Sequence, residues 1–192
     1  MKVNSGLSLD VADLFYSVPH KGMFEAVGAC IEVNGNVAFQ NQCELPLESF
    51  LELPKFYLTS TVVMFNNHSY IQKQGICIGS CVTPVQCNIF LSQCERDISQ
   101  KLPNNLMARV FRYVDDYLVL LHERPAQLQS VTINTVQSNF CKQAKGLKFT
   151  YELPTDSKIQ FLDLQLLFGK NYTCWTYSPR SKNRLLQFDS AH

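Results

Sequence analysis

Two adjacent aspartates, Asp115 and Asp116, stand inside the apolar and aromatic run FRYVDDYLVLL, which extends from Phe111 to Leu121. An unpaired carboxylate resists burial, and two neighbouring carboxylates repel each other. A tight bend at Val114 and Asp115 resolves the conflict, because the apolar arms then form a hairpin and the acids project from its tip. The two acids would still repel each other, so the pattern favours a divalent cation or another compensating charge nearby.

A third carboxylate follows a second apolar segment, LSLDVADL, in which Asp10 comes after Leu7 and Leu9. If this strand lies beside the hairpin, Asp10, Asp115 and Asp116 converge on one edge of a sheet. Such a cluster suits two Mg²⁺ ions about 4 Å apart, which clamp the attacking and leaving oxygens in phosphoryl transfer. A bare Asp-Asp pair is more often an ordinary surface turn, so the interpretation depends on the neighbouring sequence.

Composition excludes several classes of protein. The chain has 192 residues, 46% of them hydrophobic, which is typical of a globular protein with a sizeable core. No apolar run is long enough to span a bilayer and no signal peptide is visible, so we expect an intracellular protein, in the nucleus or cytoplasm, with no membrane partner. Eight cysteines without a CxxC pair predict reduced core residues, not a zinc site.

Charge is sparse overall but unevenly placed. The net charge of +1 does not by itself indicate a nucleic-acid binder. Between residues 170 and 188 there are four cations and no acid, which fits either a solvated basic face or a contact surface: Lys170, Arg180, Lys182 and Arg184.

Hydrophobic periodicity predicts an α+β fold, with hairpins and helices packed on one sheet. Helices are predicted over 21–33, over 46–60, over 80–102 and over 127–144. Hairpins are predicted over 60–75, with the turn at Asn67-His68, and over 108–121. Strands are predicted over 7–11, 147–152, 158–168 and 172–177, with a tight turn at 169–171.

Three segments carry a family resemblance. Tyr-Val-Asp-Asp within FRYVDDYLVLL resembles the catalytic hairpin of reverse transcriptases, and DVADLFYSVP resembles the first catalytic motif of that family. Between them, QGICIGSCVTPVQCNIF is similar to the Gly-rich turn and helix of the family. The three motifs occur in the family's order, which makes the resemblance much stronger than the Asp pair alone.

The last quarter of the chain narrows the resemblance to one subfamily. KFTYELPTDSKIQFLDLQLLF and YTCWTYSPRSKNRLLQFDSAH resemble the end of Penelope-like retroelement reverse transcriptases. The resemblance implies a reverse-transcriptase palm over roughly 1–155 and a palm-to-thumb transition over 156–192. It also implies that the fingers and most of the thumb are missing from this chain.

The resemblance further implies an RNA-directed DNA polymerase that extends a DNA primer on an RNA template with deoxynucleotide triphosphates. Asp10, Asp115 and Asp116 would hold two Mg²⁺ ions, or Mn²⁺ in their place, for attack of the primer 3′-hydroxyl on the α-phosphate. The residues expected around the nucleotide, template and primer end are Phe15 (the steric gate against a ribose 2′-hydroxyl), Gln74, Gly75, Gly79, Ser80 and Tyr113. Either Lys145 or Lys148 would protonate the departing pyrophosphate, unless both are ordinary solvated lysines.

Departures from the family pattern leave a second hypothesis open. Cys81 stands where the family usually has proline, which removes a rigid φ angle from the Gly-rich turn. With fingers and most of the thumb missing, the isolated chain is expected to be a non-catalytic retroelement remnant that folds and retains at most nucleic-acid binding. An RNA-directed RNA polymerase or a nuclease with clustered acids is disfavoured by Phe15 and by the Gly-rich turn.

Overall fold

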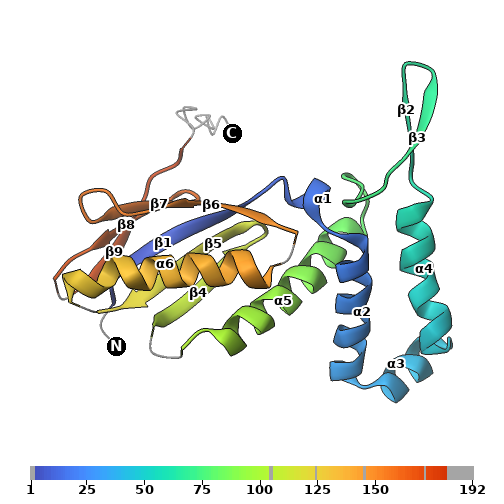
Figure 1. The fold of residues 1–192 in the computed structure, drawn as a ribbon, viewed down its shortest axis with the longest axis horizontal. Coiled ribbons are helices and arrows are strands. Elements are labelled where there is room, and N and C mark those ends of the chain that lie inside the picture. Colours follow the sequence, from blue (N-terminus) through green and yellow to red (C-terminus); the bar gives the residue numbers. More distant parts are fainter. Residues whose placement is uncertain (1–2, 104–105, 124, 145, 171, 181–192) are drawn as a thin grey trace, which may run out of the picture.

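The computed structural model describes residues 3–103, 106–123, 125–144, 146–170 and 172–180, and it confirms the α+β class. Figure 1 shows helices packed beside antiparallel strands. The elements, in chain order, are β1 (Val3–Ala12), α1 (Leu14–Ser17), α2 (His20–Asn34), α3 (Asn36–Cys43), α4 (Leu47–Thr59), β2 (Val62–Phe65), β3 (His68–Ile71), α5 (Thr83–Lys101), β4 (Met107–Tyr113), β5 (Asp116–His122), α6 (Ala126–Gln143), β6 (Lys148–Glu152), β7 (Lys158–Phe161), β8 (Leu164–Phe168) and β9 (Thr173–Tyr177).

The central sheet has the strand order β4-β5-β1-β6, and every neighbouring pair in it is antiparallel. The predicted first strand therefore does lie beside the predicted hairpin. In this register Asp10 is directly opposite Asp116 on β5 and directly opposite Thr150 on β6. Directly opposed residues of antiparallel strands point to the same face, so these three side chains share one face of the sheet.

One face of the central sheet is covered by α5 and α6, and α2 packs against α5 beside it. Alternation along β1 buries Leu7, Leu9 and Val11 on this face. Tyr117, Phe140 and Phe149 meet edge to face beneath them, with ring centroids 5.4 to 6.3 Å apart. Full burial of one such apolar side chain is worth about 1.5–3 kcal/mol, so this face supplies most of the hydrophobic stabilisation.

The opposite face of the sheet is covered over only part of its length. The smaller sheet β7-β8-β9 packs there through Ile159, Phe161 and Phe168. Gly6 permits this close approach, because a Cβ atom at that position would lie 2.8 Å from the Val119 carbonyl oxygen and 3.1 Å from the Phe168 ring. The Asp10 end of the same face adjoins two cavities instead.

Several sequence-based expectations need correction. The structure has three sheets in its described part, where one was predicted. The predicted strand 158–168 is two strands, because Leu162 has a φ of +52° in a two-residue turn that the nearly continuous apolar pattern conceals. Helix α3 was not predicted. The β2–β3 turn lies at Asn66 and Asn67, both with positive φ, and thus one residue earlier than predicted.

Burial of the cysteines was also predicted incorrectly. All eight are free thiols, as expected. Only Cys87 and Cys94 are buried, whereas Cys81, Cys141 and Cys174 are exposed. Burial raises the pKa of Cys87 to about 11 and that of Cys94 to about 12, so these two thiols stay protonated. Part of the predicted turn at 169–171 and the tail beyond residue 180 lie outside the described residues.

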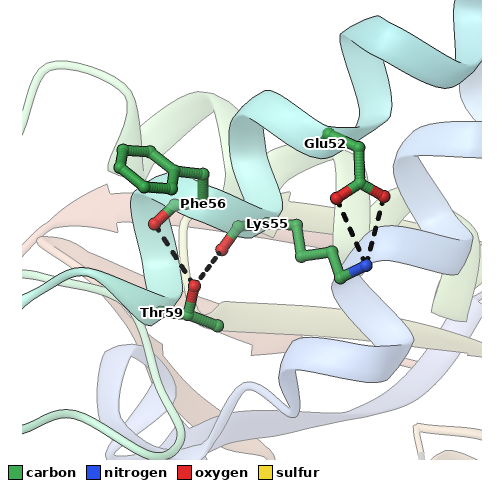
Figure 2. A network of polar contacts seen from close by, with 4 residues as sticks. All are labelled: Glu52, Lys55, Phe56 and Thr59. Carbon is green, nitrogen blue, oxygen red and sulfur yellow. Dashed lines mark hydrogen bonds and ion pairs between the residues drawn. The ribbon is translucent and has the colours of Figure 1, made fainter.

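Helix α4 contains Pro54, which can donate no backbone hydrogen bond. Exposed polar contacts lie on either side of it (Figure 2). The Thr59 hydroxyl donates to the carbonyls of Lys55 at 2.8 Å and Phe56 at 3.3 Å, and Lys55 Nζ donates to Glu52 Oε1 at 3.1 Å. Exposed pairs of this kind contribute little stability, so α4 depends mainly on its packing against α2. Among the described helices, none has the length and apolarity needed to cross a membrane.

Candidate active site

The three aspartates predicted from the sequence meet at one end of the central sheet. Each of Asp10, Asp115 and Asp116 offers a carboxylate oxygen, and these oxygens all lie within 4.8 Å of one another. The sheet register accounts for the meeting, since Asp10 and Asp116 are opposed across β1 and β5 while Asp115 occupies the adjoining turn. Hard carboxylate oxygens gathered in this way are the donor set that Mg²⁺ and Mn²⁺ prefer, so the residues fit a divalent ion.

The β4–β5 turn places Asp115 at the cost of backbone strain. Tyr113 pairs with Asp116, which leaves Val114 and Asp115 as the two central residues, as predicted. Val114 has a φ of +55°, an outlier for a β-branched residue, and such strain costs roughly 1–3 kcal/mol. The Val11 N–H donates to the Asp115 carbonyl oxygen at 3.2 Å, which ties the turn to β1. Asp116 begins β5 and is paired within the sheet, whereas the sequence-based prediction had both acids projecting from the tip of the hairpin.

Electrostatic repulsion inside this cluster is only partly relieved. Burial, followed by the charges of Asp115 and Asp10, raises the pKa of Asp116 above its ordinary value of 3.8. Arg180, close to the end of the described chain, opposes this effect and lowers that pKa. The cluster therefore carries uncompensated negative charge, which is the electrostatic condition that a bound cation would relieve.

Two polar cavities adjoin the acids. One, of about 340 Å³, is lined by Ser8, Asp10, Asp116, Thr150, Tyr151, Glu152 and Arg180. The other, of about 310 Å³, is lined by Tyr113, Asp116, Leu162, Asp163 and Arg180. The Thr150 hydroxyl donates to Asp10 Oδ2 at 3.4 Å, and Arg180 Nη2 lies 3.6 Å from Glu152 Oε2 in an ion pair. Space for a substrate thus lies directly beside the carboxylates.

Phe15 and Gly75 are brought together by their backbones. The Ile76 N–H donates to the Phe15 carbonyl at 2.6 Å, and the Gly75 N–H donates to the Val18 carbonyl at 2.9 Å. Gly75 is buried with a φ of +78°, and a Cβ there would lie 2.6 Å from the Phe15 oxygen. The absence of a Cβ at Gly75 therefore lets the Gly-rich segment pack directly against the backbone of α1.

The remaining residues predicted for the nucleotide and template pocket lie along the same segment. Gln74 and Gly79 are exposed, and Gly79 has open space where a Cβ would stand. The Ser80 hydroxyl accepts from the Val82 N–H at 3.2 Å, just before α5. Together with Phe15 and Gly75, these residues line neither of the two cavities beside the acids. Their predicted contact with a nucleotide remains a prediction.

Tyr113 and Lys148 lie on strands of the sheet that carries the acid cluster, unlike the residues of the Gly-rich segment. Tyr113 is 61% exposed and lines the cavity beside Asp116, so it is free to contact a bound molecule. Lys148 is exposed and opposite Ala12, two residues along the strand from the Asp10–Thr150 pair and on the same face of the sheet. Lys145 lies outside the described residues.

Sequence reasoning missed the polar neighbours of the triad. Thr150 and Glu152 are brought to the site by the pairing of β6 with β1, which no local pattern predicts. Arg180 was noted only as part of a basic cluster. Its approach to Asp116 depends on the path of the chain after β9.

One prediction arises from the charge repulsion. Because the pKa of Asp116 is raised by folding, the folded state loses stability as pH rises from 3.8 through that raised pKa. Asp116→Asn should therefore raise the Tm by roughly 2 °C at pH 7 in a chelator, and should give no gain below pH 3.8. Thermal unfolding across pH measures this effect, with Asp13→Asn as the control for an exposed aspartate. Equal melting of Asp116→Asn and the parent at pH 7 would contradict it.

The family is shown by sequence comparison. The model of the family "Reverse transcriptase (RNA-dependent DNA polymerase)" matches residues 2–162, which is most of the chain. The chain belongs to the reverse transcriptase family. Within this family's domain, the acid triad is formed by β1 and the β4–β5 hairpin. No curated protein matches the sequence.

Solved structures with the same fold come from telomerases. The telomerase from Candida albicans, in complex with a TWJ fragment of telomeric RNA, matches with a TM-score of 0.70 at 15% identity, covering 95% of this reverse transcriptase chain and 32% of its own. Apo telomerase from Candida tropicalis, truncated from its C-terminal domain, matches with a TM-score of 0.65 at 11% identity, covering 91% and 36% respectively. At these identities the likeness shows the fold alone. The chain spans about a third of the length of the structures it matches.

Proposed function

We propose that this chain is the palm of an RNA-directed DNA polymerase from a Penelope-like retrotransposon, with the palm over roughly 1–155 and the palm-to-thumb transition over 156–192. The observation that carries the proposal is the meeting of Asp10, Asp115 and Asp116 within 4.8 Å, in a chain of the reverse transcriptase family. Two segments support the Penelope-like subtype through their sequence resemblance to that subfamily. They are Phe161-Leu162-Asp163, at the β7–β8 turn, and strand β9.

Asp10, Asp115 and Asp116 would hold two Mg²⁺ ions, or Mn²⁺ in their place. When bound, such ions supply charge that activates a primer 3′-hydroxyl and neutralises the reacting phosphate. The protein contributes position: the opposed strands fix Asp10 against Asp116, and the strained turn adds Asp115. The resulting preorganisation leaves little rearrangement for the moment of reaction.

The other predicted residues would select and orient the substrates. Phe15 would exclude a ribose 2′-hydroxyl, so that the substrates are deoxynucleotide triphosphates. Tyr113, exposed beside Asp116, would support the primer end. The segment with Gln74, Gly79 and Ser80 would line the nucleotide and the RNA template. A protein with this fold, the matching Candida albicans telomerase, binds RNA in the form of a TWJ fragment of telomeric RNA.

A substitution at Phe15 tests the substrate assignment. Phe15→Val shortens the side chain without emptying its half-buried site, so the preference for deoxynucleotides over ribonucleotides should fall by about ten- to a hundredfold. The ratio of kcat/KM values for the two nucleotides in primer extension measures this preference, with Tyr16→Val as the exposed neighbouring control. An unchanged ratio in Phe15→Val would remove the steric-gate role.

A second candidate function is a retroelement remnant that folds but does not catalyse. It is favoured by Cys81, exposed two residues before α5, where the family usually has a rigid proline. The two candidates separate in one assay, in which the 192-residue chain alone is given an RNA template, an annealed DNA primer, deoxynucleotide triphosphates and Mg²⁺. Measurable extension that disappears with a chelator supports the polymerase. No extension by this chain, under conditions in which an unrelated active reverse transcriptase extends the same primer, supports the remnant.

A further inference from the structure

Arg112 of β4 joins the β4–β5 hairpin to helix α5. Its guanidinium group forms an ion pair with Glu95 and donates to Asn88 Oδ1 at 2.7 Å and to Ser92 Oγ at 3.5 Å. The three acceptors recur at a spacing of four and then three residues, so they form one stripe along α5. Arginine can satisfy all of them at once, because its planar fork carries five donors.

The same guanidinium also reaches the turn that carries Asp115. Arg112 Nη1 donates to the Val114 carbonyl oxygen at 3.4 Å. That oxygen belongs to the peptide group between Val114 and Asp115, so its position fixes the direction in which the Asp115 backbone leaves the turn. Since Val114 has a φ of +55°, an untethered turn has a lower-energy conformation available to it.

The tether, meaning the contacts that link Arg112 to the Val114 carbonyl and to α5, lies in a partly buried environment. The Arg112 side chain is 17% exposed and that of Glu95 is 33% exposed. Tyr117, directly opposite Arg112 on β5, faces the same carboxylate, and burial together with Glu95 raises the pKa of its phenol. A partly desolvated ion pair adds little net stability compared with an apolar pair, so the contribution of this one lies in the geometry that it fixes.

We infer that Arg112 is a positioning residue, which ties the Val114–Asp115 turn to α5 and thereby holds the Asp115 carboxylate against Asp10 and Asp116. This inference rests on the proposed function, because the triad needs a fixed geometry only if it binds and reacts. Arg112 touches none of the three carboxylates in the contacts of the described residues. Its influence on them passes through the turn.

The test needs a variant that loses the tether without leaving a buried charge unpaired. Replacing Arg112 alone would strand Glu95, so the principal variant is Arg112→Met combined with Glu95→Gln, which keeps the side-chain volume and removes both charges. Arg109→Met is the matched control, an exposed arginine on the same strand. Arg112→Lys tests the fork geometry, since one ammonium cannot replace the guanidinium contacts.

Two readouts separate positioning from folding. In the 192-residue chain, the double variant should keep the parent Tm but shift the amide resonances of Val114 and Asp115. In primer extension by a complete retroelement reverse transcriptase that carries this chain, the double variant should lower kcat by about ten- to a hundredfold, while the KM for nucleotide stays unchanged. Arg112→Lys should follow the double variant in the resonances and in kcat, and Arg109→Met should follow the parent.

The inference would be overturned if the double variant had the same turn resonances and the same kcat as Arg109→Met. It would also be overturned if Arg112→Lys had the resonances and the kcat of the parent. The failure of the proposed function has a different signature. If Asp115→Asn extends primers as the parent does, the catalytic assignment falls. The resonances of Val114 and Asp115 then decide alone whether Arg112 positions the turn.

Discussion

Replacing Asp115 by asparagine should lower primer extension by at least about a thousandfold while leaving the fold intact. The substitution keeps the shape of the side chain but removes one of three carboxylates whose oxygens lie within 4.8 Å of one another. Charge stabilisation by a divalent ion is worth several kcal/mol at a reacting phosphate, and about 4 kcal/mol corresponds to a factor of a thousand. Single-turnover extension of a labelled primer, in an intact element carrying this chain, measures the loss.

The matched control for this prediction is Asp13→Asn. Asp13 is exposed and precedes α1 in a left-handed conformation that asparagine also tolerates, and it does not belong to the acid cluster. Extension by Asp13→Asn should equal that of the parent. Equal extension by Asp115→Asn and the parent would remove the catalytic assignment of the triad, and an equal loss in both variants would show that the effect is not specific to the cluster.

Gly75→Ala should destabilise the chain by about 3 kcal/mol. A Cβ at this position would lie 2.6 Å from the Phe15 carbonyl oxygen and 2.8 Å from Tyr16 Cα, and these backbone atoms cannot move aside as a flexible side chain can. Overpacking of this kind costs about 1–3 kcal/mol, and the left-handed conformation adds about 1–2 kcal/mol for a residue with a Cβ. Urea denaturation measures the free energy of unfolding.

Gly79 provides the matched control for Gly75, because it has a φ of +94° but nothing within 4 Å of its Cβ position. Gly79→Ala should cost only the conformational part, about 1 kcal/mol. A loss of the same size in both variants would mean that the contact between Gly75 and α1 contributes nothing. Because the contact includes Phe15 itself, Gly75→Ala should also weaken discrimination against ribonucleotides.

The acid cluster could be predicted from the sequence because each of its members stands in an unusual local context. Asp10 and the Asp115-Asp116 pair interrupt apolar strands, where carboxylates without a partner are costly. The short connection between Phe111 and Leu121 left a two-residue turn as the natural solution, and the structure has it at Val114 and Asp115. Local chemistry therefore marked these residues, but their meeting was predicted only on the condition that the Asp10 strand pairs with the hairpin, as β1 does with β5.

The surroundings of the cluster could not be predicted in the same way, because they depend on long-range pairing. Thr150 reaches Asp10 through the β1–β6 register, and Arg112 reaches α5 across 17 residues of sequence to Glu95. The predicted strand 158–168 failed for a local reason instead. Apolar residues stand on both sides of the Leu162–Asp163 turn, and neither glycine nor proline marks it as the break between β7 and β8.

The most direct test of the central claim is a crystal structure of the chain grown with Mn²⁺ and a deoxynucleotide triphosphate, examined for anomalous scattering from manganese. The proposed function predicts two manganese peaks about 4 Å apart, bound by Asp10, Asp115 and Asp116. It also predicts that both peaks disappear in Asp115→Asn. Manganese bound elsewhere, or the absence of any peak at the triad at saturating Mn²⁺, would contradict the account.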